Sequence, residues 1–238
     1  MAYHFDDATI IKIIDESDEV KRFFIKMTDA VEFRFKAGQF IMINLPLDLK
    51  YNNRSYSIAS APSTDNIFEL CIVLKPTGIG TPFEWQNFEV GTKIQVSKAL
   101  GKFTIQEPVD TDICFIGTGT GIAPLRSQLL DIFNKKIPHK NIHLVFGNRW
   151  EKDILYRKEF DQLAAEHPEF RFHPVLSRDN PGWTGHKGYV HAVYEQLFAD
   201  KRPANFYICG WADMLKETRQ RLEAMGYDKK HIKFESYD

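Results

Sequence analysis

Cysteine is scarce in this sequence. Only three of the 238 residues are cysteines, Cys71, Cys114 and Cys209, and they lie far apart in apolar runs. The sequence has no Cys-x-x-Cys pair and no Cys/His cluster, which argues against a zinc site. Three sulfur ligands are also too few for an iron–sulfur cluster, which needs four. An odd, scattered set of cysteines suits a reducing compartment better than a disulfide framework.

An excess of charge of one sign and long apolar runs are lacking too. The 31 Lys and Arg residues balance 32 Asp and Glu residues, for a net charge of −1. Nucleic-acid-binding proteins normally carry a basic excess, so this function is not expected. No apolar run approaches the length that spans a bilayer, and the acidic N-terminus does not look like a signal peptide. We therefore expect a cytoplasmic protein without membrane insertion.

The first hundred residues alternate short β-type runs with turns. The runs are residues 8–14, 20–27, 39–45, 55–59, 68–74 and 93–96, and Gly, Pro, Asn and Asp lie between them. This spacing is typical of an antiparallel sandwich or barrel. One short helix is expected at residues 82–87, because Pro82 suits the first position of a helix.

From about residue 108 onwards, strands alternate with helices. Predicted strands at residues 112–116, 142–146, 170–176 and 205–208 precede predicted helices at residues 123–135, 154–166, 189–197 and 214–225. Such alternation predicts a doubly wound parallel sheet with helices on both faces. The expected fold class is therefore β plus α/β, with an antiparallel β domain over residues 1–107 and an α/β domain over residues 108–238.

A glycine-rich loop joins the first strand of the α/β domain to its helix. It reads Gly117-Thr118-Gly119-Thr120-Gly121-Ile122-Ala123-Pro124. Glycines let the backbone approach a diphosphate, and the free N–H groups of the following helix attract its charge. The usual dinucleotide fingerprint is incomplete, since Ile122 replaces its third glycine and Gly147-Asn148-Arg149 replaces its ribose-binding acid. Alone, the loop fits either a dinucleotide site or a tight turn without a ligand.

Further motifs accompany this loop in a fixed order along the chain. They are Phe35-Lys36-Ala37-Gly38-Gln39-Phe40, Arg54-Ser55-Tyr56-Ser57, Gly78-Ile79-Gly80-Thr81, Cys209-Gly210 and Phe234-Glu235-Ser236-Tyr237. Together with the glycine loop they resemble the ferredoxin–NADP reductase family, over nearly the whole chain. The resemblance implies that residues 1–107 form an FAD-binding β-barrel and that residues 108–238 form an NAD(P)-binding α/β domain.

The resemblance implies roles for residues of the β domain. Arg54 would pair with the FAD diphosphate, Tyr56 would stack on the flavin ring, and Ser57 would lie near N5, the atom that accepts hydride. Strand geometry agrees in one respect, because Arg54 and Tyr56 share one face of a strand. The other FAD contacts would come from Cys71, Ile72 and Val73 and from the turn Gly78, Ile79, Gly80 and Thr81. Taken singly, these motifs are an alternating strand and a glycine turn.

In the α/β domain the resemblance implies a dinucleotide site. Its loop would comprise Gly117, Thr118, Gly119, Thr120 and Gly121. Cys209 and Gly210 would lie beneath the nicotinamide, where Cys209 would make a steric contact and not act as a nucleophile. Glu235 would lie close to the nicotinamide, and Tyr237 would cover the second face of the flavin.

Two short motifs bear on the choice between NADPH and NADH. Ser177-Arg178 follows the third α/β strand, and Lys187-Gly188-Tyr189 follows about ten residues later. In NADP-dependent relatives, residues of these types hold the 2′-phosphate and stack on the adenine. An Arg–phosphate contact is charge-assisted and suits this discrimination. NADPH is therefore expected, with NADH as the alternative.

The expected reaction transfers hydride from NADPH to FAD and then electrons to a small redox protein such as ferredoxin or flavodoxin. Two other enzymes stay open: an NAD(P)H:flavin reductase and the NADH-dependent reductase component of an oxygenase. The iron–sulfur domain that such components usually carry is excluded within this chain by its cysteine count. The non-enzyme alternative is a dinucleotide-binding regulatory module, which would not reduce a bound flavin.

Overall fold

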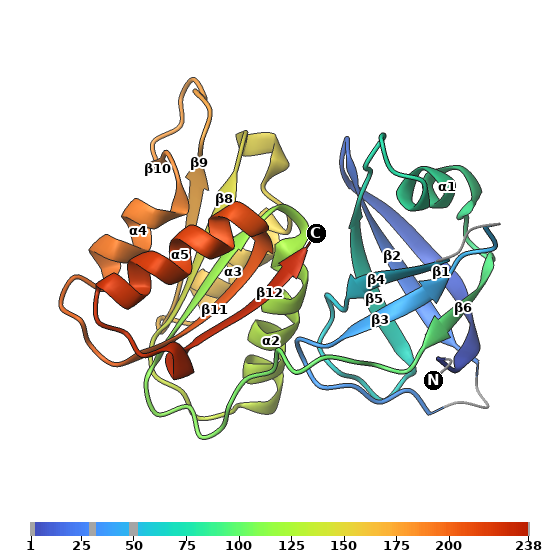
Figure 1. The fold of residues 1–238 in the computed structure, drawn as a ribbon, viewed down its shortest axis with the longest axis horizontal. Helices are drawn as coiled ribbons and strands as arrows, with labels where there is room; N and C mark the ends of the chain where they lie inside the picture. The colour runs from blue at the N-terminus through green and yellow to red at the C-terminus, as the bar shows by residue number, and fades with distance from the viewer. Residues whose placement is uncertain (1–2, 29–31, 48–51, 238) are drawn as a thin grey trace. The chain divides into compact units, whose positions relative to one another are not determined.

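The structure, a computed structural model, describes residues 3–28, 32–47 and 52–237. The chain divides into two compact units, and Figure 1 shows the elements of both. The first unit comprises Met1–Ile105 together with Arg126–Lys135, and the second comprises Gln106–Leu125 together with Lys136–Asp238. Within the described residues no helix is both long and apolar enough to cross a membrane.

The first unit is built on six antiparallel strands. They are β1 (Phe5–Ser17), β2 (Val20–Met27), β3 (Phe40–Asn44), β4 (Asn53–Ser57), β5 (Ile67–Val73) and β6 (Lys93–Ser97), in the order β4-β3-β6-β1-β2-β5. The outer strands β4 and β5 also meet, because Ile58, directly after β4, bridges Leu70 on β5. The Ala59 N–H then donates to the Glu69 carbonyl at 2.8 Å. The sheet therefore closes into a barrel, which confirms the predicted antiparallel β fold.

The barrel interior is apolar, and one helix packs against it. Alternate strand residues point inward, so Ile10, Ile25 and Ile41 are almost completely buried. The helix α1 (Gly80–Asn87) places Phe83 and Trp85 against this core. Burying this apolar surface is the main stabilising contribution to the unit.

A buried carboxylate organises the charges of the first unit. Glu69 on β5 is 3% exposed and accepts from Arg22 Nε at 2.6 Å and from Arg126 Nη1 at 3.2 Å. The same Arg126 nitrogen donates to the Ala59 carbonyl at 2.7 Å. Arg126 lies on α2 (Ile122–Lys135), which is why residues 126–135 of this helix belong with the barrel. Two guanidinium groups satisfy the carboxylate, as a buried charge requires.

The second unit is built on six parallel strands. They are β7 (Asp112–Thr118), β8 (Ile142–Asn148), β9 (Phe170–Leu176), β10 (His186–Lys187), β11 (Ala204–Trp211) and β12 (Ile232–Tyr237), in the order β10-β9-β8-β7-β11-β12. From β7 the chain adds β8, β9 and β10 on one side of the sheet. It then returns to the other side of β7 and adds β11 and β12. This reversal is the switch point of a doubly wound sheet, where the carboxyl ends of the strands commonly form ligand sites.

Helices cover both faces of the parallel sheet. Cys114 and Val175 pack with Val193 of α4 (Val190–Leu197) and Leu215 of α5 (Ala212–Ala224), in front of the sheet in Figure 1. On the opposite face Phe160 of α3 (Arg157–Glu166) contacts a ring of β9. At the sheet edge, Arg219 of α5 lies 4.0 Å from the ring centroid of Phe234 on β12. The predicted doubly wound sheet is thus confirmed.

Four elements differ most from the expectations. Helix α1 begins at Gly80, two residues before its expected start, so Pro82 is its third residue and not its first. Helix α3 begins at Arg157, three residues after its predicted start, because Tyr156 has a left-handed backbone with φ of 56°. A residue in this conformation cannot continue a right-handed helix. The strands β10 and β12 were not predicted at all.

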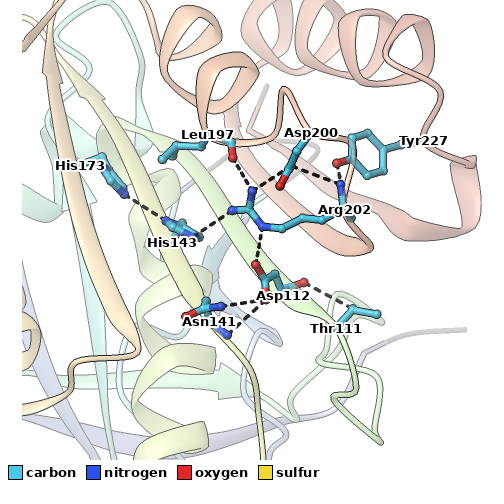
Figure 2. Close-up of polar contacts among 9 residues, drawn as sticks. All are labelled: Thr111, Asp112, Asn141, His143, His173, Leu197, Asp200, Arg202 and Tyr227. Atoms are coloured by element: carbon cyan, nitrogen blue, oxygen red, sulfur yellow. Dashed lines mark hydrogen bonds and ion pairs between the residues drawn. The ribbon is translucent and has the colours of Figure 1, made fainter.

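A polar cluster lies at the amino end of the parallel sheet (Figure 2). Arg202 Nε donates to Asp112 Oδ2 at 2.7 Å, and Arg202 Nη1 donates to the Leu197 carbonyl at 2.6 Å. Tyr227 adds a hydrogen bond from its hydroxyl to the Arg202 carbonyl at 3.0 Å. Asp112 begins β7, whereas the glycine loop follows its other end. The cluster is therefore a structural anchor remote from that loop.

A buried histidine, His143, and a half-buried one, His173, extend this cluster across the sheet. A guanidinium can only donate, so His143 Nε2, 3.5 Å from Arg202 Nη2, accepts. His143 Nδ1 then carries the proton and donates to His173 Nε2 at 3.1 Å. Burial first, and the neighbouring Arg202 next, lower the pKa of His143 to about 4. Burial and then His143 lower the pKa of His173 to about 4. Both rings are therefore neutral at neutral pH.

Candidate functional site

In the barrel, β4 carries the two side chains that were predicted to meet FAD. Arg54 and Tyr56 are half-buried and lie on the same face of the strand, which turns toward α1. A Cβ atom on Gly80 would lie 2.5 Å from Arg54 Nε. The Tyr56 hydroxyl lies 2.7 and 2.8 Å from the two carboxylate oxygens of Glu84. The strand thus places both side chains along the first half of the helix.

The predicted turn at residues 78–81 leads directly into α1. The Gly78 N–H donates to the Lys75 carbonyl at 2.9 Å, and the Lys75 N–H donates to the Thr81 hydroxyl at 2.8 Å. These bonds fix the turn, whose tip residue Ile79 is exposed. Among the described residues no side chain caps the helix. The first N–H groups of a helix have no partner within the helix, so the start of α1 beside Arg54 offers donors of the kind that a diphosphate needs.

The other predicted flavin contacts lie near the barrel closure. Ser57 is buried at the end of β4, opposite Phe40 on β3. Cys71 and Val73 lie on β5, the strand that meets the chain just after β4. Ile72 belongs to the barrel core and is 2% exposed. Its side chain is therefore committed to packing, and only its backbone remains for a ligand.

Glu84 is the residue of this region that the sequence did not reveal. It is fully buried on α1, and burial, opposed by the Tyr56 hydroxyl and by Arg54, raises its pKa to about 7. Burial first and Glu84 next raise the pKa of Tyr56 far above its ordinary value. Tyr56 is therefore the hydrogen-bond donor of the pair. The only local signal was the spacing from Gly80, which is one helical turn away.

In the second unit, the glycine loop lies against the end of the neighbouring strand. A short 3₁₀ turn, Gly119–Gly121, connects β7 to α2, and Gly119 has φ of 53°. A Cβ on Gly121 would lie 2.5 Å from the Cys209 carbonyl oxygen and 2.7 Å from Gly210 Cα. A Cβ on Gly210 would overlap with Thr118. The carboxyl ends of β7 and β11 meet this closely only because both glycines lack side chains.

The strand β12 brings the predicted C-terminal residues to the same place. In its parallel register Glu235 pairs with Cys209, Ser236 with Gly210, and Tyr237 with Trp211. Cys209 is completely buried, and burial together with the Glu235 carboxylate raises the pKa of its thiol well above the ordinary value. Because thiolates are the reactive form, this arrangement argues against a nucleophilic role for Cys209.

Trp211 is a second residue that the sequence did not reveal. It is 65% exposed, and its backbone N–H donates to the Thr118 hydroxyl at 3.4 Å. Its indole nitrogen would lie 4.0 Å from a Cβ on Gly119. The side chain therefore borders the glycine loop. Its position directly after Cys209-Gly210 was the signal that could have identified it.

The predicted NADPH-selecting residues gather at the carboxyl end of β9. The Ser177 hydroxyl donates to the Asn148 carbonyl at 3.2 Å, and the short strand β10 pairs Lys187 with Leu176. Arg178, Lys187 and Tyr189 are all exposed. Arg149, which was not predicted as a ligand, is also exposed and accepts the Arg178 N–H at its carbonyl at 3.2 Å. Three cations thus surround this end of the sheet.

Comparison with known proteins matches both units to oxidoreductase domains. Residues 7–105 match the family model described as the oxidoreductase FAD-binding domain, and residues 115–220 match the oxidoreductase NAD-binding domain. Ferredoxin–NADP reductase B of Sorangium cellulosum is 31% identical over 239 residues, which cover 98% of this chain and 97% of that protein. The chain belongs to the ferredoxin–NADP reductase family.

Two further proteins are similar over most of the chain. The glycine betaine monooxygenase reductase subunit of Chromohalobacter salexigens is 29% identical over 231 residues, covering 95% of this chain and 62% of that protein. A solved ferredoxin–NADP⁺ reductase from Neisseria gonorrhoeae, with bound FAD and NADP, aligns with a TM-score of 0.85. That alignment covers 99% of both chains at 24% identity, and it shows the shared fold.

Membership of the ferredoxin–NADP reductase family makes the protein an FAD- and NAD(P)-dependent oxidoreductase. The residues present fit both cofactors. The uncapped start of α1 beside Arg54 offers the charge and donors for one diphosphate. The Gly121–Cys209 approach offers a backbone surface, free of side chains, for a dinucleotide. FAD supplies the redox chemistry, and the protein contributes binding and electrostatics.

Proposed function

We propose that this chain is a ferredoxin– or flavodoxin–NADP reductase, which takes hydride from NADPH and passes electrons to a small redox protein. The observation that supports it most is the match to ferredoxin–NADP reductase B, which extends over 97% of that relative. The oxygenase reductase subunit is matched over only 62% of its length.

In this proposal residues 1–107 hold FAD. Arg54 and the N–H groups of Gly80 and Thr81 neutralise the diphosphate, because a guanidinium and a helix start both favour anions. Tyr56 contacts the flavin ring, and the Ser57 hydroxyl lies near N5. Gly78, Ile79, Cys71, Ile72 and Val73 complete the binding surface through backbone and small contacts.

Residues 108–238 hold the dinucleotide. The backbone of Gly117, Thr118, Gly119, Thr120 and Gly121 receives its diphosphate. Cys209 and Gly210 lie beneath the nicotinamide, Glu235 lies beside it, and Tyr237 covers a flavin face. These residues act by positioning the nicotinamide, since proximity and orientation make up most of the protein's share in such a reaction.

The preference for NADPH is supported by the cations at the end of β9. Arg178 and Lys187 are exposed there beside Ser177, and Arg149 lies next to them. A 2′-phosphate bound at this place would be paired by two or three cations, whereas the hydroxyl of NADH would leave them unused. Tyr189, 73% exposed, offers a ring for the adenine.

A cytoplasmic location is part of the same proposal. The three cysteines are buried and lie far apart along the chain, a distribution that suits a reducing compartment better than a disulfide framework.

The purified protein tests this function directly. We expect a yellow protein whose visible absorbance is bleached anaerobically by NADPH at a lower concentration than by NADH. Adding a ferredoxin or flavodoxin should then restore the oxidised spectrum quickly. A colourless protein that neither retains nor reduces added FAD would sink the proposal.

The reductase component of an oxygenase is the second candidate, favoured by the likeness to the betaine monooxygenase subunit. It predicts bleaching by NADH at least as readily as by NADPH. An NAD(P)H:flavin reductase would instead release its flavin on gel filtration. The same titration therefore separates the three enzymes.

A further inference from the structure

A buried carboxyl group lies on the helix beside the proposed FAD site. Glu84 is the only ionisable residue of α1, and its side chain is fully buried. Burying a carboxylate costs several kcal/mol unless hydrogen bonds or a counter-charge offset it. A solvent-facing position would avoid this cost, so the contacts that Glu84 makes need an explanation.

Those contacts follow from a match between a strand and a helix. Two residues along a strand advance about 6.6 Å, and four residues along a helix advance about 6 Å. Arg54 and Tyr56 on β4 therefore line up with Gly80 and Glu84 on α1. The structure shows both pairs, with Arg54 against Gly80 and the Tyr56 hydroxyl on Glu84 at 2.7 and 2.8 Å. Arg54, the proposed diphosphate ligand, thus lies against Gly80. Tyr56, the proposed flavin-ring contact, lies against Glu84 on the same face of α1.

The charges that act on Glu84 come from β4. The Tyr56 hydroxyl donates to the carboxylate, and the Arg54 guanidinium attracts it, while burial opposes its charge. On β2, Lys21 lies over the ring of the neighbouring Trp85, 5.5 Å from its centroid. Arg54 thus faces Glu84 on one side and the start of α1 on the other.

We propose that Glu84 is a positioning residue of the FAD site, which holds the Tyr56 ring by its hydroxyl and shares the positive charge of Arg54 with the FAD diphosphate. The inference rests on the proposed placement of FAD at Arg54, Tyr56 and the start of α1. In this inference Glu84 does not contact FAD itself, and it acts on the cofactor through Arg54 and Tyr56.

A linkage between FAD binding and a proton follows. Ionised Glu84 draws on the charge of Arg54 and repels the diphosphate, whereas protonated Glu84 leaves Arg54 to the cofactor. Because the pKa of Glu84 is about 7, FAD should bind more tightly below neutral pH than above it. By reciprocity, FAD binding should take up a proton near neutral pH.

The test is the affinity of apoprotein for FAD, measured by quenching of flavin fluorescence between about pH 6 and about pH 8.5. In the wild type we expect the Kd to rise about tenfold over this range, which corresponds to a shift of one pKa unit. In Glu84→Gln, which keeps an acceptor for Tyr56 but cannot ionise, the Kd should stay nearly constant. An equal pH dependence in both proteins overturns the inference.

Positioning of the ring needs a separate readout. In Tyr56→Phe the ring is kept but its hydroxyl is lost, so we expect the fine structure of the bound-flavin absorbance band to broaden. In Glu84→Gln the band should keep the wild-type shape, since the hydrogen bond is kept. Broadening in Glu84→Gln equal to that in Tyr56→Phe would contradict a role for the hydrogen bond itself.

A third variant separates failure of the inference from failure of the proposed FAD site. Arg54→Gln should weaken FAD binding at every pH, because it removes the diphosphate counter-charge. If Arg54→Gln binds FAD as the wild type does, the site itself is wrongly placed. If Arg54→Gln weakens binding but Glu84→Gln keeps the pH dependence, only the role of Glu84 fails.

Discussion

The barrel builds its part of the candidate site from side chains, whereas the α/β unit builds its part mainly from backbone. In the barrel, Arg54 and Tyr56 reach across from a strand to a helix and meet Gly80 and Glu84. In the α/β unit, the absence of a side chain at Gly121 lets the glycine loop approach the Cys209 carbonyl of β11. In the proposed site, the charge of the ligand would be met by a guanidinium and a helix start in the barrel, and by backbone N–H groups alone in the α/β unit.

This difference determines which changes each unit tolerates. A side chain that meets an added methyl group can move, so the barrel site should respond to a change of charge more than to a change of volume. Backbone packed against backbone cannot move without disturbing two strands. The α/β site should therefore respond to a single added methyl group. The following predictions test this contrast, from the largest expected effect to the smallest.

Gly121→Ala should have the largest effect. Its Cβ would lie 2.5 Å from the Cys209 carbonyl oxygen, which belongs to a central strand. We expect a loss of about 3 kcal/mol in the free energy of unfolding, as for severe overpacking, measured by urea denaturation. The control is Gly119→Ala, whose Cβ meets only the Trp211 indole at 4.0 Å. It should cost about 1 kcal/mol through its left-handed backbone. Equal losses in the two variants would remove the steric argument.

Acid should destabilise the α/β unit through the neighbouring histidines His143 and His173. Their pKa values of about 4 lie below the ordinary value of 6.5, so their contribution is full above about pH 6.5 and is lost as the pH falls toward 4. We expect the free energy of unfolding to drop by about 2 kcal/mol over this window. His173→Gln, which keeps an acceptor for His143, should flatten the drop, whereas His4→Gln, at an exposed position, should not. Glu84 acts in the opposite sense, because its raised pKa destabilises the barrel as the pH rises through 7.

Gly80→Ala should separate binding from stability in the barrel. The added Cβ meets the Arg54 side chain, which can swing away, and alanine favours a helix over glycine by up to about 1 kcal/mol. Stability should therefore stay the same or rise, while the Kd for FAD should increase about tenfold because Arg54 is displaced. Denaturation and flavin titration on one preparation measure both. Unchanged FAD affinity would show that Arg54 does not meet the diphosphate.

Arg178→Ala should give the smallest effect. The side chain is exposed, so stability should not change measurably. We expect the KM for NADPH to rise about fivefold, a typical loss for one solvent-exposed charge-assisted contact, and the KM for NADH to stay constant. Arg171→Ala removes an exposed cation from the other end of β9 and serves as the control. A parallel rise for both dinucleotides would place Arg178 away from the 2′-phosphate.

Strongly patterned segments could be predicted from the sequence. Residues 20–27 and 170–176 were predicted as strands and coincide with β2 (Val20–Met27) and β9 (Phe170–Leu176). Both segments are rich in apolar and β-branched or aromatic residues, which favour strands. The glycine loop was also predicted correctly as a strand-to-helix connection, since its signal lies within eight consecutive residues.

What the sequence did not reveal depends on contacts that are distant along the chain. Glu84 on α1 accepts a hydrogen bond from Tyr56 on β4, which lies 28 residues earlier in the chain. A strand of two residues, such as β10, has no periodicity to detect. The strand β12 mixes Lys233 and Glu235 with aromatic residues, so its pattern was that of a polar tail. Only its pairing with β11 makes it a strand.

The edges of the two sheets have a consequence for behaviour at high concentration. An unpaired strand edge is a template for pairing with other molecules and thus for aggregation. In the described part of the barrel, the Ile58–Leu70 bridge joins what would be the two outer strands. The parallel sheet stays open at β12, where Phe234 is 44% exposed and Arg219 covers its ring. Charged side chains beside an open edge disfavour pairing with a second copy, so Lys233, Glu235 and Arg219 are expected to limit self-association at this edge.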